Sequence, residues 1–190
     1  MTVTSRTTSW ASMTVTLRPA TAPDAPRVAH LLIDTRTRFM PYAPSAHTDD
    51  EVREWVVSYL VPTSRVTVAE VEGHVMGVMA TEVRDQVSWV TQMAVDPTIV
   101  GHGLGSLLLA RAVGTLVSPI RLYTFQANVG ARRFYERHGF VVIEFTDGQT
   151  NEERCPDVLY EYRVLQDEAQ SVGQADVATA RGSPQTLNRQ

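Results

Sequence analysis

Residues 87–106 read VSWVTQMAVDPTIVGHGLGS, and this stretch determines the class of fold. Its first nine residues are rich in β-branched and apolar side chains, which favours a strand. Asp96-Pro97 marks a turn, glycines then alternate through residues 101–105, and a leucine-rich helix begins at about Gly103. We therefore predict a strand, a glycine loop and an amphipathic helix in series.

The glycine loop has the properties of an anion site. Alternating glycines remove side chains where a backbone must approach a ligand, and the helix start offers unpaired N–H groups and a positive dipole end. The loop suits a pyrophosphate, with a plain turn as the alternative. A Walker loop is excluded because Gly-Lys-Ser/Thr is absent, and a dinucleotide fingerprint is excluded because one residue separates the last two glycines.

The sequence on both sides of this unit alternates between strand and helix signals. Thr48 and Glu51 form a capping box that predicts the start of a second helix, and short turns join the three strands that follow. The expected strands are 14–18, 65–70, 75–83, 87–95, 120–125, 140–145 and 158–164, and the expected helices are 25–39, one from 49, 103–117 and 128–138. This order predicts an α+β fold with a mixed sheet.

Composition restricts the function further. The chain has 190 residues, 43% of them apolar, and its 17 basic and 21 acidic residues give a net charge of −4, which disfavours a nucleic-acid partner. All basic residues are arginine, so lysine chemistry is excluded. Cys155 is the single cysteine, which excludes an internal disulfide and a cysteine-zinc cluster. We expect a cytoplasmic protein with no metal, no membrane span and no signal peptide.

The two ends differ from the middle. Residues 1–13 are rich in Ser and Thr and are expected to be a disordered leader, unless the chain truly starts at Met13. Residues 166–190 are polar without an apolar face, and we expect a disordered tail there. The folded domain is therefore predicted to span residues 14–165, with both ends dispensable unless they pack across a homodimer interface.

Two motifs in series resemble the acetyl-CoA segments of the GNAT N-acetyltransferase superfamily. The first runs from Met93 to Gly105, and the second is NVGARRFYERHGF at residues 128–140, similar to the family pattern Asn-x-x-Ala-x-x-x-Tyr-x-x-x-Gly-Phe. The resemblance covers the whole predicted domain and implies a mostly antiparallel central sheet with helices on both faces. One departure is Val100, which occupies the usual Arg/Gln position of the loop but keeps its backbone amide.

The resemblance implies acetyl-CoA as cosubstrate and direct attack by an amine on the thioester. Tyr135 is expected to protonate the departing thiolate, and a backbone N–H near 93–95 to stabilise the oxyanion. The residues expected to bind the cosubstrate are Met93, Ala94, Val95, Val100, Gly101, His102, Gly103, Leu104, Gly105, Ser106, Asn128 and Tyr135.

The general base is less evident. Trp89 holds the position at which some family members carry a glutamate on the fourth strand. Glu82 and His47 are the nearest replacements, and a water chain is an equal alternative. Cys155 is a poor nucleophile because no His-Asp partnership surrounds it.

Acceptor specificity is expected in the loops 40–49 and 148–157. The candidate substrate residues are Tyr42, His47, Asn151 and Glu152. Glu152, Glu153 and Asp157 would suit a cationic amine. We therefore expect an N-acetyltransferase acting on a small primary amine. The alternatives are a protein or peptide acetyltransferase, which needs an open groove, and a non-catalytic CoA-binding module.

Overall fold

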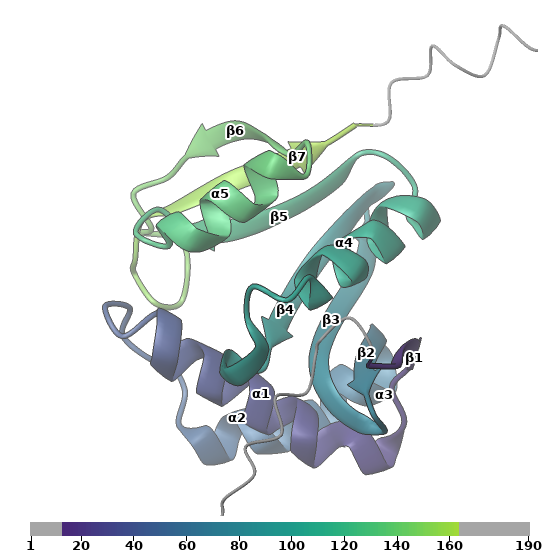
Figure 1. The fold of residues 1–190 in the computed structure, drawn as a ribbon. Coiled ribbons are helices and arrows are strands. Elements are labelled where there is room, and N and C mark those ends of the chain that lie inside the picture. Colours follow the sequence, from purple (N-terminus) through teal and green to yellow (C-terminus); the bar gives the residue numbers. More distant parts are fainter. Residues whose placement is uncertain (1–12, 164–190) are drawn as a thin grey trace, which may run out of the picture.

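The computed structural model describes residues 13–163, which form one seven-stranded sheet in the order β1-β2-β3-β4-β5-β7-β6 (Figure 1). The strands are β1 Val15–Pro19, β2 Arg65–Val71, β3 His74–Arg84, β4 Val87–Val95, β5 Ile120–Phe125, β6 Val141–Phe145 and β7 Asp157–Tyr162. The helices are η2 Ala22–Asp24, α1 Ala25–Phe39, α2 Asp49–Trp55, η3 Val56–Leu60, α3 Val61–Thr63, η4 Pro97–Ile99, α4 Leu104–Thr115 and α5 Val129–Arg137.

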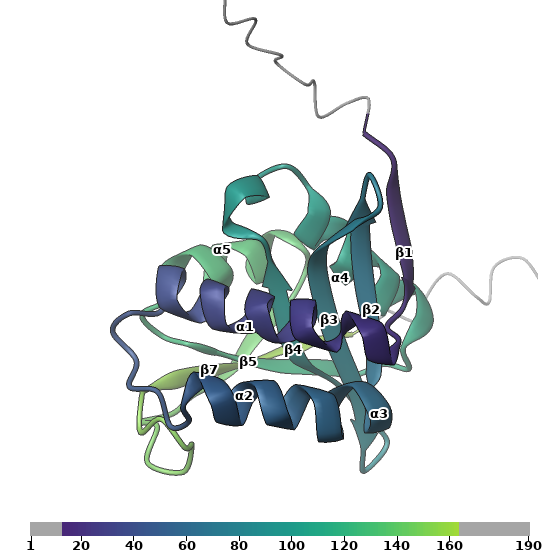
Figure 2. The ribbon, with the colours of Figure 1, turned by 90° about the horizontal axis from the view of Figure 1, so that it is seen from below.

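Helices cover both faces of the sheet. α1 and α2 lie on one face, and α4 and α5 lie on the other (Figures 1 and 2). Each face has its own apolar core: Leu31 and Val78 belong to the core under α1, and Leu104, Leu108 and Tyr160 to the core under α4 and α5. Strand residues alternate between these two cores because successive side chains point to opposite faces.

Local capping explains where the first helices begin. The Asp24 carboxylate accepts hydrogen bonds from the Thr21 N–H and from Arg18, which holds the entry to α1 against β1. The capping box predicted at Thr48 and Glu51 is present, with the Thr48 hydroxyl accepting from the Glu51 N–H at 3.3 Å. Beyond Trp55 the helix widens into the π-turns of η3 before it ends in α3.

The only parallel strand pair among the described residues is β4–β5, and it is short. The two strands pair at Ser88–Ile120 and Trp89–Arg121 and then separate, whereas every other neighbouring pair is antiparallel. A β-bulge interrupts β4, since Gln92 faces Ala80 while Val90 faces Thr81. The bulge brings Val90 and Met93 into the same core, although they are three residues apart.

The fold predicted from the sequence is confirmed. The element order and the mixed, mostly antiparallel sheet agree with expectation, and predicted element ends lie within two residues of the observed ones. The predicted leader up to residue 12 and the predicted tail lie outside the described residues. None of the helices in residues 13–163 is long and apolar enough to cross a membrane.

Candidate active site

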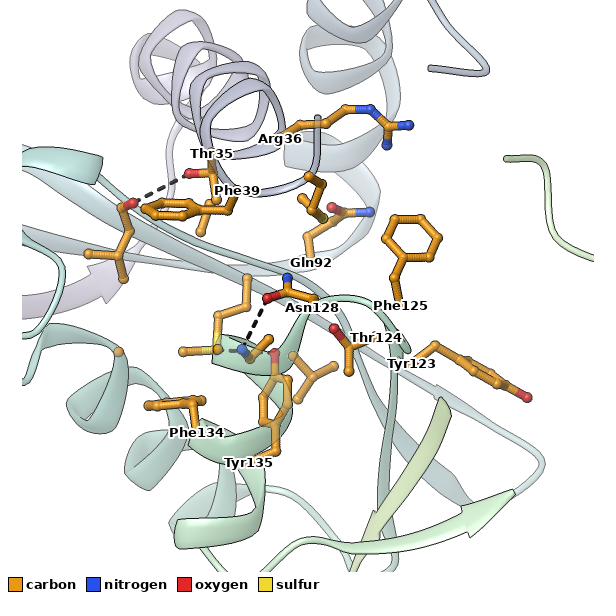
Figure 3. A pocket seen from close by; sticks show the side chains of 18 of the residues that line it. Thr35, Arg36, Phe39, Gln92, Tyr123, Thr124, Phe125, Asn128, Phe134 and Tyr135 are labelled. Carbon is orange, nitrogen blue, oxygen red and sulfur yellow. Dashed lines mark hydrogen bonds between the residues drawn. The ribbon is translucent and has the colours of Figure 1, made fainter. Parts of the chain in front are cut away.

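A cavity of about 920 Å³ opens where β4 and β5 separate, bordered by α1, α4 and α5 (Figure 3). The structure brings almost all of the predicted cosubstrate residues to its wall. Those that line it are Met93, Ala94, Val95, Val100, Gly101, Gly103, Leu104, Gly105, Ser106, Asn128 and Tyr135. His102 does not line the cavity, because its N–H and its Nδ1 both turn back to the Ile99 carbonyl, at 3.3 and 3.1 Å.

The open edge of β4 presents backbone N–H groups to this cavity. The Asp96 N–H donates to the Met76 carbonyl on the β3 side at 2.8 Å. The backbone N–H and C=O groups of successive strand residues point to opposite edges of the strand. Because those of Asp96 point to β3, those of Met93 and Val95 point away from it. Thr35 on α1 confirms this direction, because its hydroxyl donates to the Val95 carbonyl at 3.3 Å. Two backbone donors therefore face the gap that β5 leaves.

The glycine loop combines positive φ angles with an uncapped helix start. Gly101 and Gly103 have φ of +89° and +88°, a left-handed conformation that favours glycine, and a Cβ at either would project into open space. The first helical bond of α4 is Leu107 N–H to Gly103 C=O, and no side chain caps the helix. The preceding N–H groups, on residues 104–106, are free for a phosphate group.

A serine–histidine contact joins this loop to α5. His138 Nδ1 lies 2.7 Å from the Phe134 carbonyl, which only accepts, so Nδ1 carries the proton. In the neutral ring, Nε2 then accepts from the Ser106 hydroxyl at 2.9 Å. The contact holds the start of α4 beside α5, where Gly105 faces the side chains of Met93 and Phe134.

Tyr135 reaches the cavity from α5. Asn128 begins the helix by accepting the Ala131 N–H at 3.1 Å, and the Tyr135 ring lies two turns further along. Its hydroxyl points toward the space bordered by Asn128 and Thr124, and lies 4.0 Å from the Met93 sulfur (Figure 3). Burial raises the pKa of Tyr135 to about 12. The phenol therefore stays protonated at neutral pH and is available as a proton donor.

The expected base Glu82 lies elsewhere. It is on β3 opposite Trp89, where its carboxylate contacts Arg84, and it is not part of the cavity wall. Trp89 is four residues before Met93 on β4, roughly 13 Å along the strand. This placement does not support a role for Glu82 as the base, because the reacting atoms are expected at the Met93 end of β4.

The expected acceptor residues are divided between the wall and its surroundings. Asn151 lines the cavity, whereas Tyr42, His47 and Glu152 do not. Tyr42 instead packs edge-on against Phe125, with ring centroids 6.3 Å apart. Tyr42 therefore supports the wall without forming it.

Two loops in which acceptor specificity was expected contact each other beside the cavity. Arg36 on α1 pairs with Glu153 at 3.1 Å and donates to the Pro44 carbonyl at 2.5 Å. His47 Nε2 lies 3.0 Å from the Glu152 carboxylate. The loop after α1 and the loop between β6 and β7 therefore contact each other.

Several wall residues were not foreseen from the sequence. They are Thr35, Arg36, Phe39, Gln92, Tyr123, Thr124, Phe125 and Arg137. They come from α1, β4, β5 and α5 and share no local motif. The alternation of β5 indicates that Tyr123 and Phe125 share a face, but nothing in it indicates that this face borders a cavity.

Comparisons with known proteins agree with this geometry. A model of the acetyltransferase (GNAT) family matches residues 29–140. The PaiA N-acetyltransferase of Thermoplasma acidophilum, solved with coenzyme A, aligns with a TM-score of 0.66 and 16% identity over 80% of this chain and 100% of its own. The ribosomal-protein-S18-alanine N-acetyltransferase of Escherichia coli aligns with a TM-score of 0.63 and 18% identity, over 79% of this chain and 94% of its own. A search of curated protein sequences found no significant match.

The sheet opens between β4 and β5 beside the glycine loop, and the family model that matches residues 29–140 is that of an acetyltransferase family. The match of the family model over more than half of the sequence places this protein within that family. The chain belongs to the acetyltransferase (GNAT) family and is an acetyl-CoA-dependent acyltransferase.

Proposed function

We propose that this protein transfers the acetyl group of acetyl-CoA to a small primary amine by direct attack. The observation that carries the proposal is the meeting of the Tyr135 hydroxyl and the open edge of β4 at one cavity. A small acceptor is favoured over a peptide because the Arg36–Glu153 contact ties loops over the acceptor end, where a peptide would need an open groove.

The chain's own groups account for each step. The loop N–H groups at 104–106 bind the pyrophosphate, and the N–H groups of Met93 and Val95 donate to the thioester oxygen as it gains charge. The amine nitrogen bonds to the acetyl carbon, the carbon–sulfur bond breaks, and Tyr135 gives its proton to the sulfur. The nitrogen loses a proton as it becomes the amide, and that proton restores the Tyr135 hydroxyl. A positioned acid of this kind contributes on the order of 10²- to 10⁴-fold.

Acetyl-CoA binding is the first test. At a concentration 100-fold above Kd, acetyl-CoA should stabilise the protein by about 2.7 kcal/mol, measured as a thermal shift. Gly103→Asp should abolish the shift, because its carboxylate would project toward the phosphates. A wild-type protein with no shift at millimolar acetyl-CoA would refute the assignment of the loop.

Thiol release across an acceptor panel tests the reaction itself. The panel holds small primary amines, a peptide with a free N-terminus and a lysine-containing peptide. Faster turnover of small amines is expected. Preference for either peptide would refute the proposed substrate class, and no turnover of any acceptor would refute transfer to an amine.

We also propose that two copies associate through β6. This edge strand exposes apolar side chains at Val141, Val142, Ile143 and Phe145. An exposed apolar edge strand readily pairs with another chain. Light scattering should give twice the monomer mass, and Ile143→Lys should restore the monomer; a monomeric wild type would contradict this proposal.

A further inference from the structure

Asp157 differs from the other buried carboxylates of the described residues. Four acidic side chains are buried there, and three of them pair with an arginine at 2.6–2.7 Å. These pairs are Arg18–Asp24, Arg27–Asp96 and Arg121–Glu161. Within residues 13–163 Asp157 has no such partner, and among the four it alone lines the cavity.

Neutral donors hold the Asp157 carboxylate in place. The Thr146 hydroxyl donates to its Oδ1 at 2.5 Å, and the Asn151 amide donates to its Oδ2 at 2.9 Å. Asn151 is itself fixed through the Cys155 carbonyl and N–H, at 2.7 and 3.1 Å. These bonds fix its direction but supply no positive charge, and a buried charge is costly without an opposite one.

Among residues 13–163, the arginines that line the cavity are Arg36 and Arg137, and neither pairs with Asp157. Arg36 lines the same cavity but pairs with Glu153 and with the Pro44 carbonyl. Arg132, on α5, is directed to the Gln126 carbonyl and over the Phe145 ring. The positive charge that complements Asp157 is therefore expected from a ligand.

Aromatic rings adjoin the carboxylate on the same face of the sheet. Phe125 is the cross-strand partner of Asp157, and Tyr123 is two residues before Phe125, so all three side chains share a face. The Tyr123 ring is 51% exposed although it stacks on Trp89. Burial raises the pKa of Tyr123, and the charges of Asp157 and Glu144 raise it further.

We propose that Asp157 binds the acceptor nitrogen, which enters as the ammonium of a primary amine with an apolar or aromatic body. The carboxylate attracts the charge, and the rings of Tyr123 and Phe125 contact the body and favour a cation near their faces. This deepens the proposed function and rests on it. Of the three acids that the sequence offered for a cationic amine, Glu152, Glu153 and Asp157, it assigns the amine-binding role to Asp157 on β7.

The proton balance is complete with groups already named. The ammonium loses one proton to Asp157, and the free amine forms the nitrogen–carbon bond. As the carbon–sulfur bond breaks, the sulfur takes the proton of the Tyr135 hydroxyl. The nitrogen loses a second proton, and this proton replaces the one that Tyr135 gave up. Asp157 then releases its proton to solvent, so one amide, one CoA thiol and one proton result.

Asp157→Asn is the decisive variant because it removes the charge and keeps the shape. With the best amine of the panel, kcat/KM should fall on the order of 100-fold, while the acetyl-CoA Kd stays the same. Asp147→Asn is the matched control, since Asp147 is exposed on the loop that leads into β7 and its Oδ1 accepts the Gln149 N–H at 3.0 Å. The control should keep the wild-type kcat/KM.

Binding of a matched ligand pair separates charge recognition from a structural role. By calorimetry, wild-type protein should bind phenethylamine at least about 10-fold more tightly than 2-phenylethanol, its neutral analogue. Asp157→Asn should bind both alike. Equal binding by the wild type overturns the proposal even if Asp157→Asn does not fold.

The outcomes separate this inference from the proposed function. If Asp157→Asn keeps the wild-type kcat/KM, the inference is wrong and amine acetylation stands. If the wild type discriminates phenethylamine from 2-phenylethanol but acetylates no amine, the proposed function is wrong and the cation site stands.

Discussion

Removing the Tyr135 hydroxyl is the sharpest test of the proposed chemistry. Tyr135→Phe keeps the ring that contacts Phe134, Phe140 and Tyr160. The oxygen that is lost contacts the Met93 sulfur, a weak acceptor, at 4.0 Å. Unfolding free energy near neutral pH should therefore change by less than about 1 kcal/mol.

The expected loss of rate follows from the two acids involved. A phenol with a pKa of about 10 and a thiol with a pKa of about 8.5 differ by about 1.5 units, or about 2 kcal/mol. Burial raises the pKa of Tyr135 to about 12. The same surroundings raise the pKa of the thiol, so the difference stays comparable. Proton transfer from Tyr135 to the thiolate therefore has a low enough energy cost to occur. Removing the Tyr135 hydroxyl should lower kcat by about 10- to 100-fold.

The assay is stopped-flow thiol release with the best amine, beside calorimetric Kd values for acetyl-CoA. The Kd should be unchanged, because the proton is needed only as the carbon–sulfur bond breaks. An unchanged kcat, in a regime where chemistry limits turnover, would refute the assignment of Tyr135 as the acid. Tyr135 would then be a packing residue of α5.

The same variant reports on alkaline stability. The pKa of Tyr135 is higher in the folded protein than the unfolded value of about 10, so its contribution is complete below pH 10 and is lost as pH rises through 12. At pH 11 the unfolding free energy of the wild type should have fallen by about 1.4 kcal/mol relative to that of Tyr135→Phe. Urea unfolding of both proteins at pH 8 and pH 11 measures this difference, and parallel pH dependences would show that the hydroxyl is not buried.

Three further variants test other parts of the structure. Asp24→Asn should lower the unfolding free energy at pH 7 by about 1–3 kcal/mol. Hydrogen bonds from Arg18 hold the pKa of Asp24 well below its usual range, so the wild-type advantage is present above about pH 4 and shrinks as pH falls, which urea unfolding at pH 7 and pH 3 measures. Arg137→Ala should weaken acetyl-CoA binding about 10-fold in calorimetry and leave acetyl-pantetheine unaffected, because this guanidinium lines the cavity and can contact a phosphate; equal losses for both ligands would contradict a phosphate contact. Glu82→Gln should leave kcat/KM unchanged, because its carboxylate contacts Arg84 outside the cavity; a large loss of kcat would restore Glu82 as a candidate base.

Local features of the fold were predictable because their causes lie within a few residues. The capping box at Thr48 and Glu51 joins groups three residues apart. Gly139 follows α5 with a φ of +83°, the left-handed conformation in which a glycine commonly ends a helix. The start of α4 after Gly103 also follows from adjacent residues. Such signals depend on neighbouring residues and need no knowledge of the sheet.

The shape of the site depended on contacts between distant segments. Arg36 and Glu153 are 117 residues apart, and nothing in either segment indicates that they pair. The bulge in β4 adds one residue to a run that reads as an unbroken strand. The bulge changes which side chains face the cavity. The sequence therefore assigned Met93 and Ala94 to the site, but it did not show that their side chains lie on opposite faces of the sheet.

The sequence by itself determined the strand–glycine loop–helix unit, the helix with Tyr135 and thereby the acetyl-CoA side of the site, because backbone conformation and periodicity express these features locally. On the acceptor side the sequence indicated the loops 40–49 and 148–157, but the tertiary structure decided which of their residues line the cavity. Glu82, His47, Glu152 and Asp157 are equivalent acids or bases when read along the chain. Only the fold shows which carboxylate is buried at the cavity without an arginine, because burial and ion pairing depend on which distant strands become neighbours.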